Sequence, residues 1–264
     1  MQYTINQYHN ISYIQRGGTS YILHAINSYN NQECIIKLSV DNNRQQHLYN
    51  ESRILANINH QNIIRLLDVN KVGNQLYLVL ELLKGKTLQE YVDINGSLDY
   101  STILYILEEI CKGIQYLHNL NIVHKDLKPK NIFLCDNGDI KILDFGLSSF
   151  VNDKQPKLCT RIVGSIDYMS PLHVLYPEKV DKRYDLYALA SVLYFMSTGN
   201  IIFNNSSINN KIRKKLLGYI DTSSIQNVNI IELFNIIMGM YTLDDIDTSR
   251  LINMIRVKNI IHQW

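Results

Sequence analysis

The sequence lacks any strong excess of charge. Its 264 residues include 26 basic and 24 acidic side chains, which gives a formal net charge of +2. This balance argues against nucleic acid as a partner, because proteins that bind phosphate backbones carry a clear excess of lysine and arginine. Hydrophobic residues make up 46% and charged residues 19% of the chain, so the composition predicts a packed core rather than disorder.

Long hydrophobic runs are missing as well. The longest apolar stretch, at 186–196, directly follows Asp185 and is too short to cross a bilayer, so a buried helix explains it better. The first ten residues contain no cationic stretch followed by an apolar run, which is the pattern of a secretory signal peptide. We therefore expect a soluble intracellular protein without a membrane partner, in the cytoplasm or alternatively in the nucleus.

Cysteine is scarce, and the cysteines lie far apart. None of Cys34, Cys111, Cys135 and Cys159 forms a CxxC pair, the spacing typical of zinc sites and redox motifs. We expect buried, reduced thiols rather than a metal site or a disulfide framework, in keeping with an intracellular location. Repeats, proline-rich linkers and long charge runs are also absent, so the length favours one domain or two closely packed lobes.

The first part of the chain has the pattern of strands with one helix between them. The apolar spacing across residues 45–58 predicts that helix. Short, apolar and often β-branched stretches predict the strands, and they lie at 20–26, 33–40, 63–69 and 75–82.

After residues 84–87 the pattern becomes helical. Apolar residues recur on one face of the stretch 101–120, which is typical of an amphipathic helix. Further helices are expected at 185–198, 230–241 and 248–262. The sequence thus predicts an α+β fold, in which a small β-rich lobe with one helix precedes a larger, mainly helical lobe.

One predicted hairpin interrupts the helical half. Two strand-like stretches flank residues 136–139, DNGD, and an Asn-Gly pair is a strong signal for a tight turn. Asn131 enters the first strand and Asp144 leaves the second, so antiparallel pairing brings both to one end, where Asp126 also lies. Amide and carboxylate oxygens suit Mg²⁺, which binds through substrate phosphates as well. We therefore predict a Mg²⁺ site at this end of the hairpin.

Residues 124–131, HKDLKPKN, followed by the DFG tripeptide at 144–146, resemble the catalytic loop and the metal-binding loop of eukaryotic protein kinases. The resemblance extends over nearly the whole chain, roughly from residue 13 to residue 264. It implies a bilobal protein-kinase fold that forms a single domain over 1–264, with an N-lobe at 1–80, a hinge at 81–85 and a C-lobe at 86–264.

The resemblance implies a Ser/Thr protein kinase that transfers the γ-phosphoryl group of Mg-ATP to serine or threonine hydroxyls of protein substrates. Asp126 would accept or orient the proton of the acceptor hydroxyl, and Lys128, typical of Ser/Thr kinases, would lie near the transferring phosphoryl group. Asn131 and Asp144 would hold Mg²⁺. Asp185 resembles the buried aspartate that ties the catalytic loop to the long central helix.

The small lobe and the hinge would form the ATP site. By resemblance, Lys37 anchors the phosphates, and Glu51 pairs with Lys37 because a flexible ammonium needs a fixed partner. The backbone of Glu81 and Leu83 would meet adenine. The other residues implied to contact the nucleotide are Gln15, Gly17, Ser20, Ile22, Ile35 and Phe133.

Several positions depart from the family pattern. Gln15 and Ser20 stand where the phosphate-covering loop usually has glycine, whose missing Cβ lets backbone N–H groups approach phosphate. Ile35 replaces an alanine at the roof of the adenine pocket. Lys125 replaces an arginine that typically clamps a phosphate on the activation segment, and Leu172 replaces a glutamate that normally pairs with a buried arginine late in the chain.

Two alternatives to an active protein kinase remain open. One is a pseudokinase that acts as a binding module, which Ile35 and the altered loop favour but the intact catalytic positions oppose. The other is a small-molecule phosphotransferase, against which the DFG tripeptide and the stretch GSIDYMSP at 164–171 argue. Thr160 is the leading candidate for regulatory phosphorylation, ahead of Ser148 and Ser149, and a regulatory protein partner is a further expectation.

Overall fold

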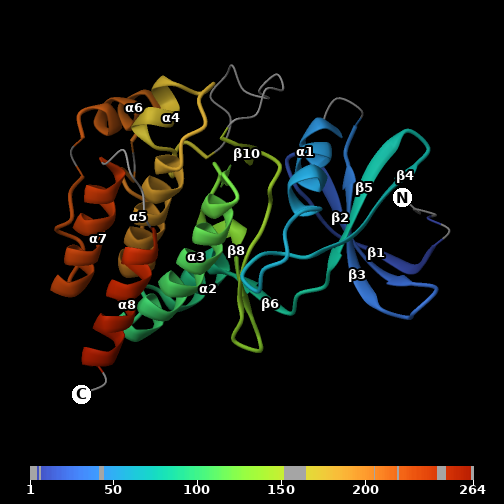
Figure 1. Ribbon diagram of the computed structural model, residues 1–264, viewed down its shortest axis with the longest axis horizontal. Helices are drawn as coiled ribbons and strands as arrows, with labels where there is room; N and C mark the ends of the chain where they lie inside the picture. Colours follow the sequence, from blue (N-terminus) through green and yellow to red (C-terminus); the bar gives the residue numbers. More distant parts are fainter. Residues whose placement is uncertain are drawn as a thin grey trace.

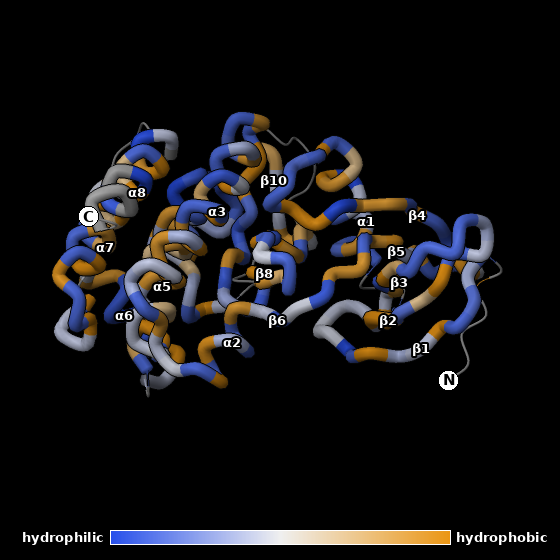
Figure 2. The backbone as a smooth tube through the Cα atoms, turned by 90° about the horizontal axis from the view of Figure 1, so that it is seen from below, coloured by the Kyte–Doolittle hydropathy of each residue, from blue (hydrophilic) through white to orange (hydrophobic). Residues whose placement is uncertain are grey.

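A sheet with one helix and a larger group of helices lie side by side in the molecule (Figure 1). They are seen in a computed structural model that describes residues 5, 7–41, 45–151, 165–204, 206–218, 220–242 and 248–262. The predicted α+β architecture with two lobes is confirmed. Figures 1 and 2 both place the short strands β6 and β8 between the sheet and the helices.

The N-lobe is a five-stranded antiparallel sheet with the strand order β1-β2-β3-β5-β4. Seven of the nine residues of β1 are exposed, so no core-facing pattern marks this strand and the sequence prediction missed it. Strand β4 begins later than the predicted residue 63. The elements of the lobe are β1 (Tyr8–Arg16), β2 (Ser20–Asn27), β3 (Glu33–Ser39), α1 (Gln45–Leu55), β4 (Leu66–Val72) and β5 (Gln75–Glu81).

Side chains alternate between the two faces of this sheet, and both faces are apolar. One face, with Leu23, Ile36 and Val79, forms a separate cluster that Tyr8 closes. The other face includes Leu78 and belongs to the main core, which continues into the C-lobe. The second face is therefore the one that looks toward α1 and the C-lobe.

The C-lobe is built around α5, in which 13 of 16 residues are buried. A helix that is apolar on all sides belongs inside a protein. Helices α3 and α7 pack against α5, and α8 packs against α3. Within the described ranges, no helix combines the length and apolarity that a membrane span requires. The helices are α2 (Leu88–Asn95), α3 (Tyr100–Asn119), α4 (Pro171–Leu175), α5 (Arg183–Thr198), α6 (Ile208–Leu216), α7 (Val228–Tyr241) and α8 (Thr248–His262).

The helices α3, α5, α7 and α8 lie where the sequence predicts helices, whereas α2, α4 and α6 were not predicted. Figure 2 shows hydrophobic stretches along α5 and the strands of the sheet, as apolar periodicity requires. Helices α2 and α4 are short, which leaves too few turns for such a period to appear. Helix α6 was not predicted because the side chain that it buries is that of a lysine, Lys215.

Short strands shape the space between the lobes. Strands β6 (Gly85–Thr87), β8 (Ile132–Cys135) and β9 (Ile140–Ile142) form one sheet, and β7 (Ile122–Val123) pairs with β10 (Ser149–Phe150). The predicted β8–β9 hairpin is confirmed, and residues 136–139 connect its two strands. The Cys135 N–H donates to the Asp139 carbonyl at 2.8 Å, and Gly138 closes the turn at φ 92°.

The described cysteines are free thiols. Cys34 and Cys111 are buried as predicted, whereas Cys135 is only half-buried, because it is the last residue of β8 at the exposed turn. Cys159 lies outside the described residues.

Candidate active site

The N-lobe sheet presents three of the predicted ATP-site residues on one face. Residues paired directly across antiparallel strands point to the same side of a sheet. Ile22 pairs with Lys37, and Ile35, two residues before Lys37, pairs with Leu80. Ile35 packs against the main core. The structure therefore brings Ile22, Ile35 and Lys37 together on the face that belongs to the main core.

Lys37 is the charged centre of this face. Its Nζ donates to Glu51 at 2.7 and 3.0 Å and to Asp144 Oδ1 at 3.0 Å. Lys37 and Glu51 are only 8% and 1% exposed, so neither charge is compensated by water and each depends on the other. Burial lowers the pKa of Lys37, but Asp144 and Glu51 outweigh that effect and raise the pKa, so the amine is a cation.

The same ammonium keeps Asp144 ionised. The attraction of Lys37 lowers the pKa of the Asp144 carboxyl to about 2, against the opposing effect of burial. The side chain of Asp144 is 45% exposed, and its backbone has φ 63°, in the left-handed region that few residues other than glycine adopt. Such strain is typical of functional sites, and an ionised, accessible carboxylate can bind a cation.

A side chain of helix α1 also holds the backbone of the DFG tripeptide and of the residues just after it. The side-chain nitrogen of Asn50 donates to the carbonyl oxygens of Ser148 at 2.7 Å and Gly146 at 3.1 Å. Asn50 is 6% exposed and directly precedes Glu51. The sequence prediction missed this residue. The available signal was weak, since one polar residue on the inner side of an amphipathic helix does not reveal its partners.

The β8–β9 hairpin brings Asn131 and Asp144 to one end. The Leu143 N–H donates to the Asn131 carbonyl oxygen at 2.8 Å, and Asp144 is the next residue. The Asn131 amide nitrogen donates to the Asp126 carbonyl oxygen at 2.8 Å, which leaves the amide oxygen as the atom suited to a cation. Together with the ionised Asp144 it forms a pair of hard oxygen ligands. That pair fits Mg²⁺, which completes its shell with phosphate oxygens and water.

Four polar residues meet at the catalytic loop, three from the loop itself and the fourth being Ser165. Lys128 Nζ donates to Asp126 Oδ2 at 2.5 Å and to Ser165 Oγ at 3.0 Å. The Ser165 N–H donates to Asp126 Oδ1 at 3.3 Å, and the Asn131 amide donates to Oδ2 at 3.2 Å. Asp126 is 9% exposed. Its carboxylate is thus fixed by several donors and can take a proton from a hydroxyl brought against it.

A buried carboxylate attaches the catalytic loop to α5. Asp185 accepts from the backbone N–H groups of His124 and Lys125 at 2.9 Å each, and it contacts His118 Nε2 at 2.9 Å. Burial raises the pKa of Asp185, but its interactions with His118 and His124 lower it overall. The sequence prediction missed His118, although a polar residue four positions after Ile114 on the apolar face of α3 is a recognisable signal.

Residues 82–84 link the lobes beside the predicted adenine position. The Glu81 carboxylate accepts from the Arg65 N–H at 2.9 Å and pairs with Lys141 at 2.8 Å, so this side chain is engaged away from a ligand. Leu83 packs against the main core. In β8, Phe133 lies between Ile132 and Leu134, which both pack in or against the main core. Because side chains alternate along a strand, the Phe133 ring points away from that core.

The turn between β1 and β2 contains residues 17–19. The Gly17 N–H donates to the Ser20 carbonyl oxygen at 2.8 Å, and Gln15 pairs across the strands with Ile22. Gln15 is exposed, whereas Ser20 is 3% exposed. The structure therefore groups Gln15, Gly17 and Ile22 at the end of the sheet, while the Ser20 side chain is buried.

The candidate regulatory sites have different surroundings. Ser148 is fully buried, and its hydroxyl donates to the His124 carbonyl oxygen at 3.1 Å, which argues against Ser148 as a phosphorylation site. Ser149 is half-buried in β10. Thr160 lies outside the described residues.

Comparisons with known proteins agree with this geometry. The protein kinase domain family matches residues 8–255. A probable serine/threonine-protein kinase of Clostridium acetobutylicum is 32% identical over 193 residues, which are 71% of this chain and 29% of that protein. The serine/threonine-protein kinase ATG1c of Arabidopsis thaliana is 38% identical over 167 residues, 62% of this chain and 22% of that protein.

A third relative is the serine/threonine-protein kinase PrkC of Bacillus subtilis, which is 33% identical over 167 residues, 63% of this chain and 26% of that protein. The chain thus spans less than a third of the length of each of these three relatives. The family match, by contrast, covers nearly the whole chain. With Lys37 bonded to Glu51 and to Asp144 of the DFG tripeptide, the match establishes that this chain belongs to the protein kinase family.

Proposed function

We propose that this chain is an active Ser/Thr protein kinase, which uses Mg-ATP to phosphorylate serine or threonine hydroxyls of protein substrates. The observation that carries the proposal is the closed triad in which Lys37 Nζ lies within 3.0 Å of Glu51 and Asp144. A buried ammonium fixed in this way suits phosphate binding. A protein that only binds a partner has no need of it. The relatives named as serine/threonine-protein kinases support the acceptor type.

The proposed reaction assigns one task to each residue. Asp126 takes the proton of the acceptor hydroxyl as its oxygen bonds to the γ-phosphorus, and the bond to the β-phosphate oxygen breaks, so that ADP leaves with the electron pair. Lys128 offsets negative charge on the transferring group, and Lys37 orients the phosphates. Mg²⁺, when held by Asn131 and Asp144, neutralises further phosphate charge.

A protein substrate is favoured by residues 165–171, which we name the acceptor segment. Ser165 at its start is bonded to Lys128 and Asp126, and the segment runs from there to α4. The segment begins with a turn, in which the Tyr168 N–H donates to the Ser165 carbonyl oxygen at 2.9 Å, and it lies beside the catalytic carboxylate, where a polypeptide acceptor would have to bind. We also propose that residues 1–264 form one kinase domain with a hinge at 81–85, because β1–β5 and α1 precede the hinge and α2–α8 follow it.

Transfer of radiolabel from [γ-³²P]ATP tests the proposal. We expect the wild-type chain with Mg²⁺ to label casein, with the label on serine or threonine after acid hydrolysis. Asp126→Asn and Lys37→Met should abolish labelling. Lys71→Met, which removes an exposed lysine of β4, is the matched control and should retain it.

Three outcomes would contradict the proposal. Retained ATP binding without any transfer would indicate a pseudokinase. Labelling of aminoglycosides or other small alcohols, but not of proteins, would indicate a small-molecule phosphotransferase. Labelling that survives both Asp126→Asn and Lys37→Met would belong to a contaminant.

A further inference from the structure

Helix α6 has the reverse of the polarity expected for a surface helix. Of its nine described residues, the buried one is Lys215, which is 2% exposed, whereas Ile208 and Leu216 are 64% and 46% exposed. A surface helix normally buries its apolar side chains and exposes its charges. Because taking an ammonium out of water is costly, this inversion needs a reason. It also explains why apolar periodicity did not predict α6.

Lys215 is bound to a residue of the acceptor segment. Its Nζ donates to the Asp167 carbonyl oxygen at 3.0 Å and lies 3.3 Å from the Tyr187 hydroxyl of α5. The amine also lies 4.7 Å from the Tyr187 ring centroid and 5.8 Å from that of Phe203, within range of cation–π attraction. Lys211, one turn earlier in α6, donates to the Asp167 carboxylate at 2.5 Å. Asp167 is therefore held through its backbone and its side chain by one helix.

These contacts fix the middle of the acceptor segment, and the start of the segment is bonded to the catalytic loop. Two residues before Asp167, Ser165 bonds to Lys128. At the far end, the Leu172 N–H donates to the Tyr241 hydroxyl at 3.3 Å. Since Leu172 stands where the family has a glutamate that pairs with an arginine, the hold on this end is a neutral hydrogen bond. A neutral hydrogen bond is weaker than a charged one, which increases the weight of the α6 contact.

We propose that Lys215 is a positioning residue for the protein substrate. It fixes Asp167 from α6 and so keeps the acceptor segment, with Ser165, against Asp126. The inference rests on the proposed kinase function and adds the determinant that aligns the polypeptide. Lys37 and Glu51 of the ATP triad lie in the N-lobe, and none of the hydrogen bonds of the triad involves Lys215.

A purely structural role does not account for this lysine. A buried charge stabilises a fold only when its partners outweigh the cost of taking it out of water. Burial here lowers the pKa of Lys215 to about 7, against the attraction of Asp167 and with the repulsion of Lys211, so the site penalises the charge it contains. A methionine would fill a similar volume without that penalty, and Lys211 would still pair with the Asp167 carboxylate. It would lose the hydrogen bonds to the Asp167 carbonyl oxygen and the Tyr187 hydroxyl, together with the cation–π contacts.

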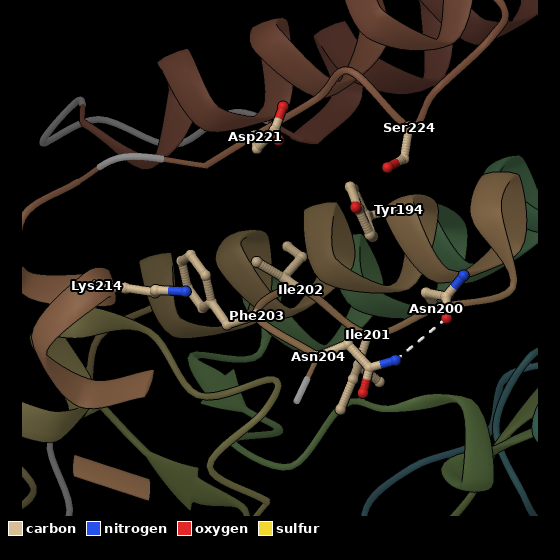
Figure 3. A pocket seen from close by; sticks show the side chains of 9 residues that line it. All are labelled: Tyr194, Asn200, Ile201, Ile202, Phe203, Asn204, Lys214, Asp221 and Ser224. Atoms are coloured by element: carbon tan, nitrogen blue, oxygen red, sulfur yellow. Dashed lines mark hydrogen bonds between the residues drawn. The ribbon is translucent and has the colours of Figure 1, made fainter. Parts of the chain in front are cut away.

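Lys214 provides a matched control. Figure 3 shows it beside Phe203 at the edge of a cavity of about 400 Å³. Its amine lies 5.7 Å from the Phe203 ring centroid, close to the value for Lys215, but it donates to Ser206 Oγ at 3.2 Å instead of to Asp167. The two lysines share a helix and the aromatic neighbour Phe203, but Lys215 is buried and contacts the acceptor segment, whereas Lys214 is exposed and bonds Ser206.

The experiment is steady-state kinetics with the protein that the wild-type chain labels, varying ATP and protein substrate separately. In Lys215→Met we expect the KM for the protein substrate to rise about tenfold, as loss of a buried hydrogen bond would give. The KM for ATP should stay within about twofold of the wild-type value. Lys214→Met should leave both constants unchanged. Lys215→Gln, which keeps a donor without the charge, should give an intermediate KM for the protein substrate.

The melting temperature separates positioning from folding. We expect Lys215→Met to melt at or above the wild-type temperature, and if it fails to fold, Lys215→Gln alone decides the test. An unchanged KM for the protein substrate, or an equal rise in Lys214→Met, would overturn the inference while leaving the kinase function intact. A lower melting temperature with a fall in kcat and no change in either KM would also overturn it. Absence of transfer by the wild-type chain would remove the proposed function and this inference together.

Discussion

The residues of the candidate site work in pairs drawn from distant parts of the sequence. Glu51 of α1 fixes Lys37 of β3, Asn50 holds the carbonyl groups that follow Asp144, and Asp185 of α5 holds the catalytic loop. Most of these groups are buried. Removing one member therefore leaves its partner without a hydrogen bond in a place that water reaches poorly, which costs more than the bond itself.

Asn50→Ala tests this reasoning on a residue that does not touch the substrate. Loss of two hydrogen bonds of about 1 kcal/mol each should let the DFG tripeptide shift and lower kcat/KM for ATP by about 10- to 30-fold. Steady-state kinetics at varied ATP measures the effect. Asn57→Ala, at an exposed asparagine that bonds the Arg53 carbonyl at the end of the same helix, is the control. An unchanged kcat/KM in Asn50→Ala would contradict the role of Asn50.

Lys37→Met should change the titration of Asp144. Because the attraction of Lys37 is the largest cause of the lowered pKa, we expect that pKa to rise from about 2 toward the ordinary 3.8. A carboxyl whose folded pKa lies below its unfolded value adds stability above pH 3.8 and loses it as the pH falls toward 2. Lys37→Met should therefore not lose this stability as the pH falls from 3.8 toward 2. Carbon-13 NMR titration of the Asp144 carboxyl measures the pKa, and an unshifted value would show that another group holds the charge.

Among the helices and strands, those that follow a local residue pattern could be predicted from the sequence. The helices α3, α5, α7 and α8 follow apolar periodicity, and the β8–β9 hairpin follows its Asn-Gly turn. The HKD and DFG loops were located because order and spacing identify them. Strand β1 and helix α6 were missed because one lies exposed at the edge of the sheet and the other buries a lysine. Asn50 and Lys215 could not be predicted, since their partners are close only in the folded chain.

Gly85→Ala tests the join between β6 and β8. Gly85 has φ 143°, and a Cβ there would lie 2.0 Å from the Leu134 carbonyl oxygen, so backbone atoms would have to move. We expect the free energy of unfolding to fall by about 2 to 4 kcal/mol. Gly73→Ala, at φ 57° with nothing within 4 Å of its Cβ, should cost only about 1 to 2 kcal/mol. Urea unfolding measures both, and equal losses would contradict the close approach.

For the whole molecule, Lys215 links stability to pH. Its pKa is about 7 in the folded chain and 10.5 when unfolded. The unfolded chain therefore binds more protons between these pH values, and stability should rise with pH across that window. The slope from this group is on the order of 1 kcal/mol per pH unit. Burial raises the pKa of the neighbouring Tyr187 above its ordinary value, so Tyr187 stays neutral there.

The comparison of Lys215→Met with the wild-type chain isolates this effect. The variant should have the larger free energy of unfolding at pH 6.5, and its advantage should shrink by pH 8.5. Urea unfolding at several pH values measures the difference. Lys214→Met is the control and should follow the wild-type curve. Parallel curves for Lys215→Met and the wild-type chain would contradict a pKa near 7.

The hydrogen bonds that the backbone of the catalytic loop donates to Asp185 also determine how slowly these amide protons exchange with solvent. The N–H protons of His124 and Lys125 point at a carboxylate inside the most buried helix of the molecule, so deuterium can replace them only when the packing around α5 opens. Their exchange in heavy water should be as slow as unfolding of the entire chain. The Gly138 amide in the exposed hairpin turn should exchange far sooner. Heat or denaturant would then remove the catalytic loop only together with the whole helical lobe.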